Sequence, residues 1–363
     1  MIKPLIIIAA GGTGGHMFPA KAFAEEAVKR GAEVALITDP RGKKYTEGFP
    51  CIDSLVLSVT NSEEGGIQGK IQAGFTLLKS LSKTNPFLKK HNPSAVVGFG
   101  GYPTFPALFA ASCPVIVHEQ NAVLGRVNRF FQKKAAKICS GFAQLDGLEL
   151  PEKHIVVGNP VRQELVALRD LPYPELVPNG ELRILITGGS QGSRALGQAL
   201  PLAIAELPEH LRLRLFVSHQ VREEQADEAR EVYSAAGVQA EVWPFFRNMA
   251  ARFEKAHLVI GRSGASTVYE VAVVGRPAIF VPLPSAMNDH QTFNALAIAA
   301  SGGAEILKES EMSVARLTEM LEERLIQPEK LISRAEKIKQ AARPDAASAL
   351  ADVVFGEIGA NNA

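Results

Sequence analysis

The stretch LIIIAAGGTGGH (residues 5–16) decides the fold. Its apolar run predicts a strand that is buried on both faces. The glycines that follow allow a sharp turn and leave backbone N–H groups accessible at the start of a helix. The stretch RILITGGSQGSR (residues 183–194) repeats this order in the second half of the chain. We interpret the two stretches as the openings of two Rossmann-like halves.

Short apolar runs alternate with longer amphipathic stretches along both halves. This alternation is typical of an α/β protein whose parallel sheets are covered on both faces. The sequence therefore predicts two Rossmann-like domains with parallel sheets and an interdomain cleft. The strands are expected at residues 5–10, 33–38, 94–98, 114–117 and 155–157, and then at 183–187, 213–217, 240–243, 258–260 and 278–281.

A proline-broken stretch without periodicity follows Arg162 and predicts a domain boundary. We expect an N-terminal domain at 1–162, a C-terminal domain at 163–343 and a helix within 344–363 that packs back on the N-terminal domain. A charged helical stretch is expected at about 313–343, and Asp345 is the expected N-cap of the last helix. Ligands of such sheets bind beyond the carboxyl ends of the strands, so both glycine turns should face the cleft.

Composition excludes several classes of protein. The chain has 363 residues, with 46% apolar and 21% charged residues, which are globular values rather than those of a disordered, collagenous or coiled-coil chain. Its cysteines (Cys51, Cys113 and Cys139) are odd in number and widely spaced, so we expect neither disulfides nor a zinc knuckle. The first apolar run is too short for a secretory signal, and no stretch is long and apolar enough to predict a membrane span.

Charge is distributed unevenly between the two halves. Residues 1–162 carry 19 Lys and Arg against 12 Asp and Glu, and within 65–145 Glu119 is the one acid among ten basic residues. An anionic partner of the first half is therefore expected. Nucleic acid is disfavoured because no stacking or recognition-helix motif accompanies the charge.

Apolar and basic residues interleave within 67–90, and this pattern leaves two interpretations open. It suits a core-facing amphipathic helix with a solvated basic face, and equally an interfacial surface on an anionic membrane. Lys133, Lys134 and Lys137 would add charge to such a surface. The interleaved residues are Ile67, Lys70, Ile71, Phe75, Leu78, Lys79, Leu81, Lys83, Phe87, Lys89 and Lys90.

The first glycine loop admits two readings. It contains the first glycines of a dinucleotide fingerprint, and Asp39 ends the second strand as the ribose-binding acid of NAD enzymes does, so an NAD-dependent dehydrogenase is one alternative. The third glycine of that fingerprint is replaced by Met17. The four glycines of residues 11–15 favour a loop that a phosphate group approaches closely.

Two further polar motifs follow predicted strands. In RSGASTVYE (262–270), Ser263 is the expected N-cap, Gly264 and Ala265 leave the helix start accessible to an anion, and Glu270 suits vicinal ribose hydroxyls. HEQN (118–121) is expected to line the cleft. The chain has no D-x-D motif, so neither a metal nor any other cofactor is predicted.

The motifs considered together are GGTGGH (11–16), GFGGYPTFP (98–106), HEQN (118–121), GNPVR (158–162), GGSQG (188–192), RSGASTVYE (262–270) and the DHQ..NA run (289–295). In this combination and order the chain resembles the MurG family over nearly its whole length. The resemblance implies the two-domain GT-B glycosyltransferase fold. It implies inverting transfer of GlcNAc from UDP-GlcNAc to the muramyl 4-hydroxyl of lipid I, which yields lipid II at the cytoplasmic face of the inner membrane. The N-terminal domain would then face acceptor and membrane, and the C-terminal domain would bind the donor.

The resemblance also implies roles for individual residues. It implies a loop near the donor sugar and diphosphate at Thr13, Gly14 and Gly15, with Asn121 nearby, and donor contacts from the hinge at Arg162 and from the second glycine loop at Ser190. It implies a main-chain uracil site at Phe246 and a contact to the GlcNAc hydroxyls at Gln291. The implied nucleotide-binding helix start consists of Ala265, Ser266, Thr267, Val268, Tyr269 and Glu270.

The hydroxyl of the acceptor needs a general base, and His16 is the first candidate. It lies at the start of a helix beside the expected cleft, and a neutral imidazole can accept a hydroxyl proton. The positive end of the helix should help to keep it neutral. Glu119 and His118 are the rival bases, and a loop-shaping role for His16 stays open. A non-catalytic nucleotide-sugar-binding protein is the alternative from another class.

Overall fold

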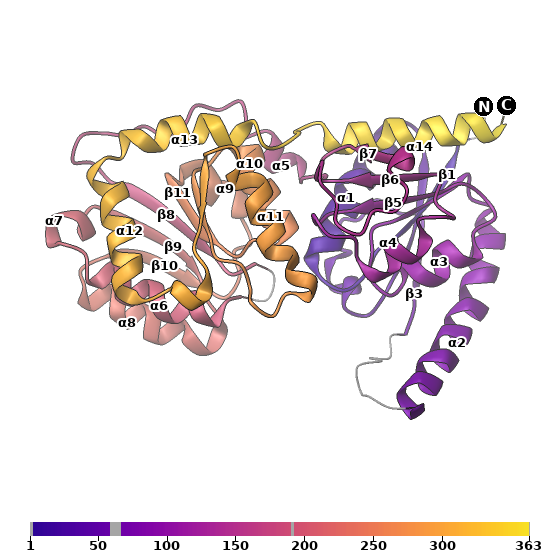
Figure 1. Ribbon diagram of the computed structural model, residues 1–363, viewed down its shortest axis with the longest axis horizontal. Coiled ribbons are helices and arrows are strands. Elements are labelled where there is room, and N and C mark those ends of the chain that lie inside the picture. The colour runs from indigo at the N-terminus through magenta and orange to yellow at the C-terminus, as the bar shows by residue number, and fades with distance from the viewer. Residues whose placement is uncertain (1–2, 59–66, 190–191, 363) are drawn as a thin grey trace. The chain divides into compact units, whose positions relative to one another are not determined.

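The computed structural model describes residues 3–58, 67–189 and 192–362. The chain forms two compact units. Unit 1 consists of residues 1–162 and 344–363, and unit 2 of residues 163–343. Each unit contains a parallel sheet with helices on both faces, so the predicted fold class, α/β with two Rossmann-like domains, is confirmed (Figure 1).

Unit 1 has a seven-stranded sheet in the order β3-β2-β1-β4-β5-β6-β7, with every pair parallel. Its strands are β1 (Leu5–Ala9), β2 (Glu33–Thr38), β3 (Asp53–Val56), β4 (Ala95–Gly98), β5 (Val115–Glu119), β6 (Lys137–Ser140) and β7 (His154–Val156). Its α-helices are α1 (Gly14–Lys29), α2 (Ile67–His91), α3 (Thr104–Ala110), α4 (Arg126–Phe131) and α14 (Ala346–Asn362).

Unit 2 has a six-stranded sheet in the order β10-β9-β8-β11-β12-β13, also parallel throughout. Its strands are β8 (Leu182–Thr187), β9 (Leu215–Gln220), β10 (Gln239–Trp243), β11 (Leu258–Gly261), β12 (Ala278–Phe280) and β13 (Ala304–Ile306). Its α-helices are α5 (Gln163–Val166), α6 (Arg194–Ala205), α7 (Glu209–Arg212), α8 (Ala226–Ala235), α9 (Met249–Lys255), α10 (Ala265–Val274), α11 (His290–Ala299), α12 (Val314–Ile326) and α13 (Glu329–Lys339).

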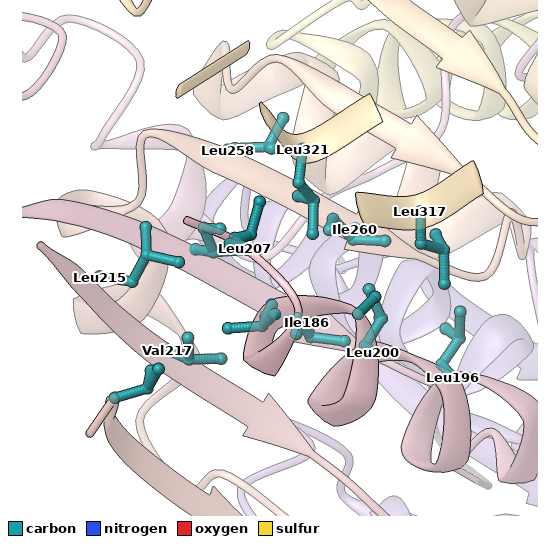
Figure 2. Close-up of a cluster of buried hydrophobic side chains, with 14 of the residues drawn as sticks. Ile186, Leu196, Leu200, Leu207, Leu215, Val217, Leu258, Ile260, Leu317 and Leu321 are labelled. Carbon is teal, nitrogen blue, oxygen red and sulfur yellow. The ribbon is translucent and has the colours of Figure 1, made fainter. Parts of the chain in front are cut away.

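The unbroken apolar runs of the central strands are explained by burial on both faces. In β1, Ile6 and Ile8 belong to the core beside α1, whereas Ile7 and Ala9 belong to the core on the opposite face. Figure 2 shows the corresponding packing in unit 2, where Ile186 of β8 and Ile260 of β11 lie in one cluster with leucines of α6 and α12. Each such buried aliphatic side chain contributes roughly 1.5–3 kcal/mol by removal from water.

The last helix, α14, completes one core of unit 1. Leu350 and Val354 are fully buried there, in the same cluster as residues of α1. The guanidinium of Arg30 at the end of α1 fixes the register of the two helices. It donates to the Ser348 carbonyl at 3.0 Å and to Asp352 at 2.5 Å. Unit 1 is therefore built from both ends of the chain.

The short strands β3, β6 and β13 were not predicted. They have four, four and three residues, and polar or charged residues interrupt their apolar pattern, as in Asp53-Ser-Leu-Val56. The predicted helical stretch at 313–343 forms two helices, α12 and α13, because Pro328 interrupts it. Periodicity detects long elements, and these short ones depend on their neighbours in the sheet.

We expect Leu350→Ala to lower the unfolding free energy by about 2–5 kcal/mol, since it leaves a cavity beneath α14. Asp352→Ala on the same helix is the matched control and should cost at most about 1 kcal/mol, because its ion pair with Arg30 is exposed. Urea unfolding followed by circular dichroism measures both. Equal, small effects would mean that α14 does not contribute to the core of unit 1.

Candidate functional site

Each sheet has a point at which the strand order reverses. It lies between β1 and β4 in unit 1 and between β8 and β11 in unit 2. The connections from the two central strands leave in opposite directions there, and ligands of doubly wound sheets bind at this position. The loops after β1 and β4 carry the GGTGGH and GGYP motifs, and those after β8 and β11 carry GGSQG and RSGAS. All four glycine motifs therefore lie at switch points.

The two loops of unit 1 pack so closely that side chains are excluded. A Cβ atom on Gly11 would lie 2.6 Å from the ring of Pro103, and one on Gly101 would lie 2.7 Å from the carbonyl oxygen of Gly11. Gly101 also has a φ of +82°, which favours glycine. The Thr104 hydroxyl donates to the carbonyls of Ala9 and Gly100 and ties the second loop to β1. The glycines are therefore required by packing as well as by turning.

Asp39 is fully buried and holds the first glycine loop. Its Oδ1 accepts hydrogen bonds from the backbone N–H of Gly12 at 3.0 Å and of Gly42 at 2.7 Å, and its Oδ2 pairs with Arg41 at 3.2 Å. A ribose-binding acid would point its carboxylate toward the ligand. Because this carboxylate is turned into the protein, the structure argues against the NAD-dependent dehydrogenase alternative.

His16 lies in the first turn of α1, after the N-cap Thr13. Its Nδ1 is 2.8 Å from the carbonyl oxygen of Gly11. A carbonyl can only accept, so in the neutral ring Nδ1 carries the proton and Nε2 carries the lone pair. A Cβ on Gly100 would lie 3.1 Å from Nε2, so a glycine there keeps that nitrogen uncovered. His16 is half-buried and has the tautomer that a general base needs.

The HEQN motif was expected to line a cleft, but its first three residues are buried. Nε2 of His118 lies 3.0 Å from the Gly158 carbonyl, and Gln120 donates to its Nδ1. Desolvation lowers the pKa of His118 to about 4, so the ring is neutral. These contacts argue against His118 as the base.

The carboxylate of Glu119 is occupied by loop contacts. It accepts from the backbone N–H and the side-chain amide of Asn121, from the N–H of Gly125 and from the side-chain amide of Asn128. The side chain is only 3% exposed. This arrangement shapes the loop after β5 and favours His16 over Glu119 as the base.

Arg162, the last residue of the GNPVR motif, lies beside the start of α1. Its guanidinium stands 5.0 Å from the centre of the Phe18 ring. The same ring covers Gly14, on which a Cβ would lie 2.7 Å from it. The structure thus brings the predicted residues Gly14, His16 and Arg162 to one helix start, while Asn121 follows the neighbouring strand β5.

In unit 2, Ser190 of the second glycine loop lies outside the described residues. The flanking positions require glycine, since a Cβ on Gly188 would lie 2.2 Å from the backbone nitrogen of Ser193. Ser193 is the N-cap of α6 and accepts from the N–H of Leu196. The loop therefore leads directly into a helix N-terminus, as predicted for a phosphate-binding turn.

Gln220 is a residue of this region that the sequence analysis missed. Its Oε1 accepts from the Thr187 hydroxyl, and its Nε2 donates to the carbonyls of Gly189 and Pro244. It connects the second glycine loop with the segment of Phe246. A buried glutamine at the carboxyl end of a strand was the available signal, but its partners are distant in sequence.

Phe246, which the resemblance places at a uracil site, is 3% exposed and lies beneath the guanidinium of Arg252 at 4.3 Å. The neighbouring Phe245 is 62% exposed. Since the ring of Phe246 is buried against Arg252, it is not available to stack on a base.

Helix α10 begins at Ala265 with Gly264 as N-cap, which contributes no side-chain hydrogen bond. The expected N-cap Ser263 is therefore wrong by one residue: it lies buried ahead of the helix, and its Oγ has no hydrogen-bond partner. The predicted residues divide by exposure. Ser266, Thr267 and Glu270 are half-exposed, and Ala265, Val268 and Tyr269 are buried.

Gln291, in the first turn of α11, is half-buried. Its Oε1 accepts from the backbone N–H of Leu283 at 3.0 Å. This bond fixes the segment 282–288, whose role the sequence left open, against the start of α11. Among the described residues, no group of three or more His, Cys, Asp or Glu side chains could hold a metal ion.

Comparison with known proteins gives concordant results. The N-terminal domain of glycosyltransferase family 28 matches residues 6–140, and its C-terminal domain matches residues 183–350. A UDP-N-acetylglucosamine–N-acetylmuramyl-(pentapeptide) pyrophosphoryl-undecaprenol N-acetylglucosamine transferase of Caulobacter vibrioides is 47% identical over 97% of this chain and 99% of its own. The enzyme of that name from Rhodospirillum centenum is 45% identical over 98% and 95%.

Solved structures agree with these relatives. The crystal structure of Acinetobacter baumannii MurG superposes with a TM-score of 0.77 at 31% identity and covers 98% of this chain and 100% of its own. A UDP-GlcNAc 2-epimerase of Neisseria meningitidis bound to UDP-GlcNAc has a TM-score of 0.67 at 14% identity, covering 97% and 100%, and shares the fold.

Burial of His118 predicts a pH dependence of stability. Its pKa is lowered from 6.5 to about 4 by folding, so protons bind the unfolded chain preferentially. This contribution is fully favourable above pH 6.5 and falls by up to about 3 kcal/mol as the pH drops toward 4. We expect His118→Gln to flatten the decline in urea midpoint between pH 7 and 5. His210 is exposed, so His210→Gln should leave the decline in urea midpoint unchanged. If His118→Gln also leaves this decline unchanged, burial of a neutral His118 is not its cause.

Proposed function

The chain belongs to the MurG family of glycosyltransferases, and we propose that unit 2 binds its donor while unit 1 carries the base that activates its acceptor. The protein is an N-acetylglucosaminyltransferase of peptidoglycan synthesis. It transfers GlcNAc from UDP-GlcNAc to the muramyl 4-hydroxyl of undecaprenyl-diphosphate-linked MurNAc-pentapeptide, converting lipid I into lipid II. Identity of 45–47% over nearly the full length of its relatives carries this conclusion.

The reaction is an inverting displacement at C1 of GlcNAc. The muramyl 4-oxygen forms a bond to C1 while the bond from C1 to the diphosphate breaks, and the electron pair of that bond leaves with UDP. Two groups are needed in the transition state: a base that takes the hydroxyl proton and donors that stabilise the diphosphate.

Donor binding is assigned to the switch point of unit 2. The start of α10 has no side-chain cap, so its N–H groups and the positive end of the helix dipole can receive a diphosphate. The second glycine loop leads into the N-terminus of α6 and adds further backbone donors. Glu270, half-exposed in α10, is the proposed partner of the ribose hydroxyls. The backbone at Phe246 is the proposed partner of uracil.

His16 is the proposed base. Its Nδ1 is committed to the Gly11 carbonyl, which leaves the Nε2 lone pair for the acceptor proton. Thr13, Gly14, Gly15, Asn121 and Arg162 are proposed donor-binding neighbours from unit 1, and Ser190 and Gln291 from unit 2.

His16→Ala and Glu270→Ala should separate catalysis from binding. Loss of a base should lower kcat roughly 10²–10⁴-fold and leave the affinity for UDP-GlcNAc nearly intact. Loss of the ribose contact should weaken UDP-GlcNAc binding by about 1–3 kcal/mol. Transfer to a short-chain lipid I analogue measures kcat, and titration calorimetry with UDP-GlcNAc measures the donor affinity.

Each variant is the control for the other. A fall in kcat of less than tenfold in His16→Ala, or a loss of donor affinity as large as the loss of rate, would make His16 a loop-shaping residue. Unchanged affinity in Glu270→Ala would remove Glu270 from the donor site.

A membrane-docking face is proposed on unit 1. Helix α2 exposes Phe75 and Leu78, at 69% and 65% of their surface, and two further phenylalanines are similarly exposed: Phe109 at the end of α3 and Phe130 in α4. The rings of Phe109 and Phe130 both lie against Phe105, at 6.2 and 5.2 Å between centroids. Exposed apolar side chains grouped in this way suit insertion among lipid headgroups.

Basic residues accompany these side chains. Lys79, Lys83 and Lys89 on α2 and Lys133 after α4 are exposed. Two other lysines that were expected on this face form ion pairs within the protein: Lys90 with Asp53 and Lys137 with Glu357. The side chains of Ile67, Lys70 and Ile71, also expected to contribute, lie outside the described part of the structure. No helix in that part combines the length and apolarity needed to cross a membrane.

Charge reversal tests this docking face. We expect Lys79→Glu, Lys83→Glu and Lys89→Glu together to abolish sedimentation with vesicles rich in phosphatidylglycerol, since each lysine contributes about 1 kcal/mol near an anionic surface. Turnover of a soluble short-chain acceptor should be retained. The matched control reverses the exposed Lys308, Lys330 and Lys337 of unit 2 and should sediment normally. Unimpaired sedimentation of the first variant would contradict the proposal.

A further inference from the structure

We propose that Asp39 is a positioning residue that acts on His16 through the peptide group joining Gly11 to Gly12. This inference rests on the proposed role of His16 as the base. It also gives a function to a buried carboxylate whose sequence position first suggested a cofactor site.

One peptide group is held from both sides. Its N–H, which belongs to Gly12, donates to Oδ1 of Asp39 at 3.0 Å. Its carbonyl, which belongs to Gly11, accepts from Nδ1 of His16 at 2.8 Å. Because the lone pair of the amide nitrogen is delocalised onto the carbonyl oxygen, a carboxylate on the N–H side makes that oxygen a stronger acceptor. Asp39, the peptide group and His16 thus form a continuous chain of polarised hydrogen bonds.

The surrounding structure fixes this peptide group in one orientation. Gly12 has a φ of +88°, a conformation that glycine adopts without strain. Gly101 abuts the Gly11 carbonyl so closely that a Cβ there would lie 2.7 Å from the oxygen. The second hydrogen bond to Oδ1, from the N–H of Gly42 at 2.7 Å, anchors the carboxylate itself. The arrangement is therefore rigid.

The chemical consequence appears when His16 accepts a proton. The muramyl hydroxyl proton moves to Nε2, and the imidazole becomes an imidazolium whose Nδ1–H still donates to the Gly11 carbonyl. The carboxylate of Asp39 stabilises the new positive charge through the dipole of the intervening peptide group. The aspartate of a Ser-His-Asp triad acts similarly through a direct bond, so an interposed peptide should give a smaller effect.

Other charged groups near this chain are few among the described side chains. Arg41 pairs with Oδ2 of Asp39 and is 59% exposed, and Arg162 lies over the ring of Phe18 on α1. The carboxylate of Asp39 therefore offsets the positive charges of Arg41 and Arg162 near His16.

Asp39→Asn is the direct test, because asparagine has the same shape and its oxygen can still accept from both amides. We expect kcat to fall about tenfold to a hundredfold with the KM for UDP-GlcNAc within about twofold. Without the negative charge the imidazolium is less stable, so the acidic limb of the kcat profile should move to lower pH. A fall in rate with an unshifted profile, or no fall at all, would overturn the proposal.

Asp53→Asn is the matched control. Asp53 lies on β3 in the same sheet and accepts hydrogen bonds from Lys90 and His91 rather than from the glycine loop. Its substitution should leave kcat and the pH profile unchanged. If Asp39→Asn fails to fold, Gly101→Ala provides a second test, because its methyl group displaces the Gly11 carbonyl while Asp39 keeps its charge. The same loss of kcat is then expected.

A double-mutant cycle separates this inference from the proposed function. If Asp39 acts through His16, Asp39→Asn should have little further effect on the residual rate of His16→Ala. An equal effect in both backgrounds would show that Asp39 acts elsewhere. Full activity of His16→Ala would instead contradict the proposed base itself, whatever the effect of Asp39→Asn.

Discussion

A parallel sheet buried on both faces brings the carboxyl ends of all its strands to one edge, and at the switch point the two central connections separate. Backbone groups that follow the strands are left without ladder partners there, and side chains are crowded out by the neighbouring loop. In this protein the constraint applies twice, at β1/β4 and at β8/β11. The glycine loops, the helix starts and the polar side chains of the proposed site all follow from it.

Histidine illustrates how this environment assigns chemistry to residues of one type. His118 lies inside the sheet of unit 1, and burial keeps it neutral with both ring nitrogens engaged. His16 lies one step beyond the strands, with one nitrogen held and the other beside a glycine. The same imidazole is thus a structural element in one position and the proposed base in the other. Each ring has one backbone carbonyl partner, and the difference is the side-chain amide of Gln120, which engages the second nitrogen of His118.

The two units meet different electrostatic demands. Unit 2 is proposed to bind a diphosphate largely through backbone amides and helix ends, which are fixed in place and need no reorganisation during the reaction. Two of its buried arginines are committed to internal contacts: Arg262 donates to the carbonyls of Val281 and Pro282, and Arg276 to those of Phe253 and Glu254. Unit 1 instead exposes Lys79, Lys83 and Lys89 on α2, which we propose to meet an anionic surface.

The sequence by itself determined the fold class, the central strands and the location of the glycine loops, because long apolar runs and glycine clusters are local signals. It also indicated the family, through motifs spread over nearly the whole chain. The short strands β3, β6 and β13 escaped it, since their pairing depends on neighbours in the sheet. Tertiary structure alone decided that Asp39 faces Gly12 rather than a ribose, that Gln220 joins two loops, and that Glu119 and His118 are occupied. Hydrogen bonds between segments many residues apart settle such roles, and they exist only once the chain has folded.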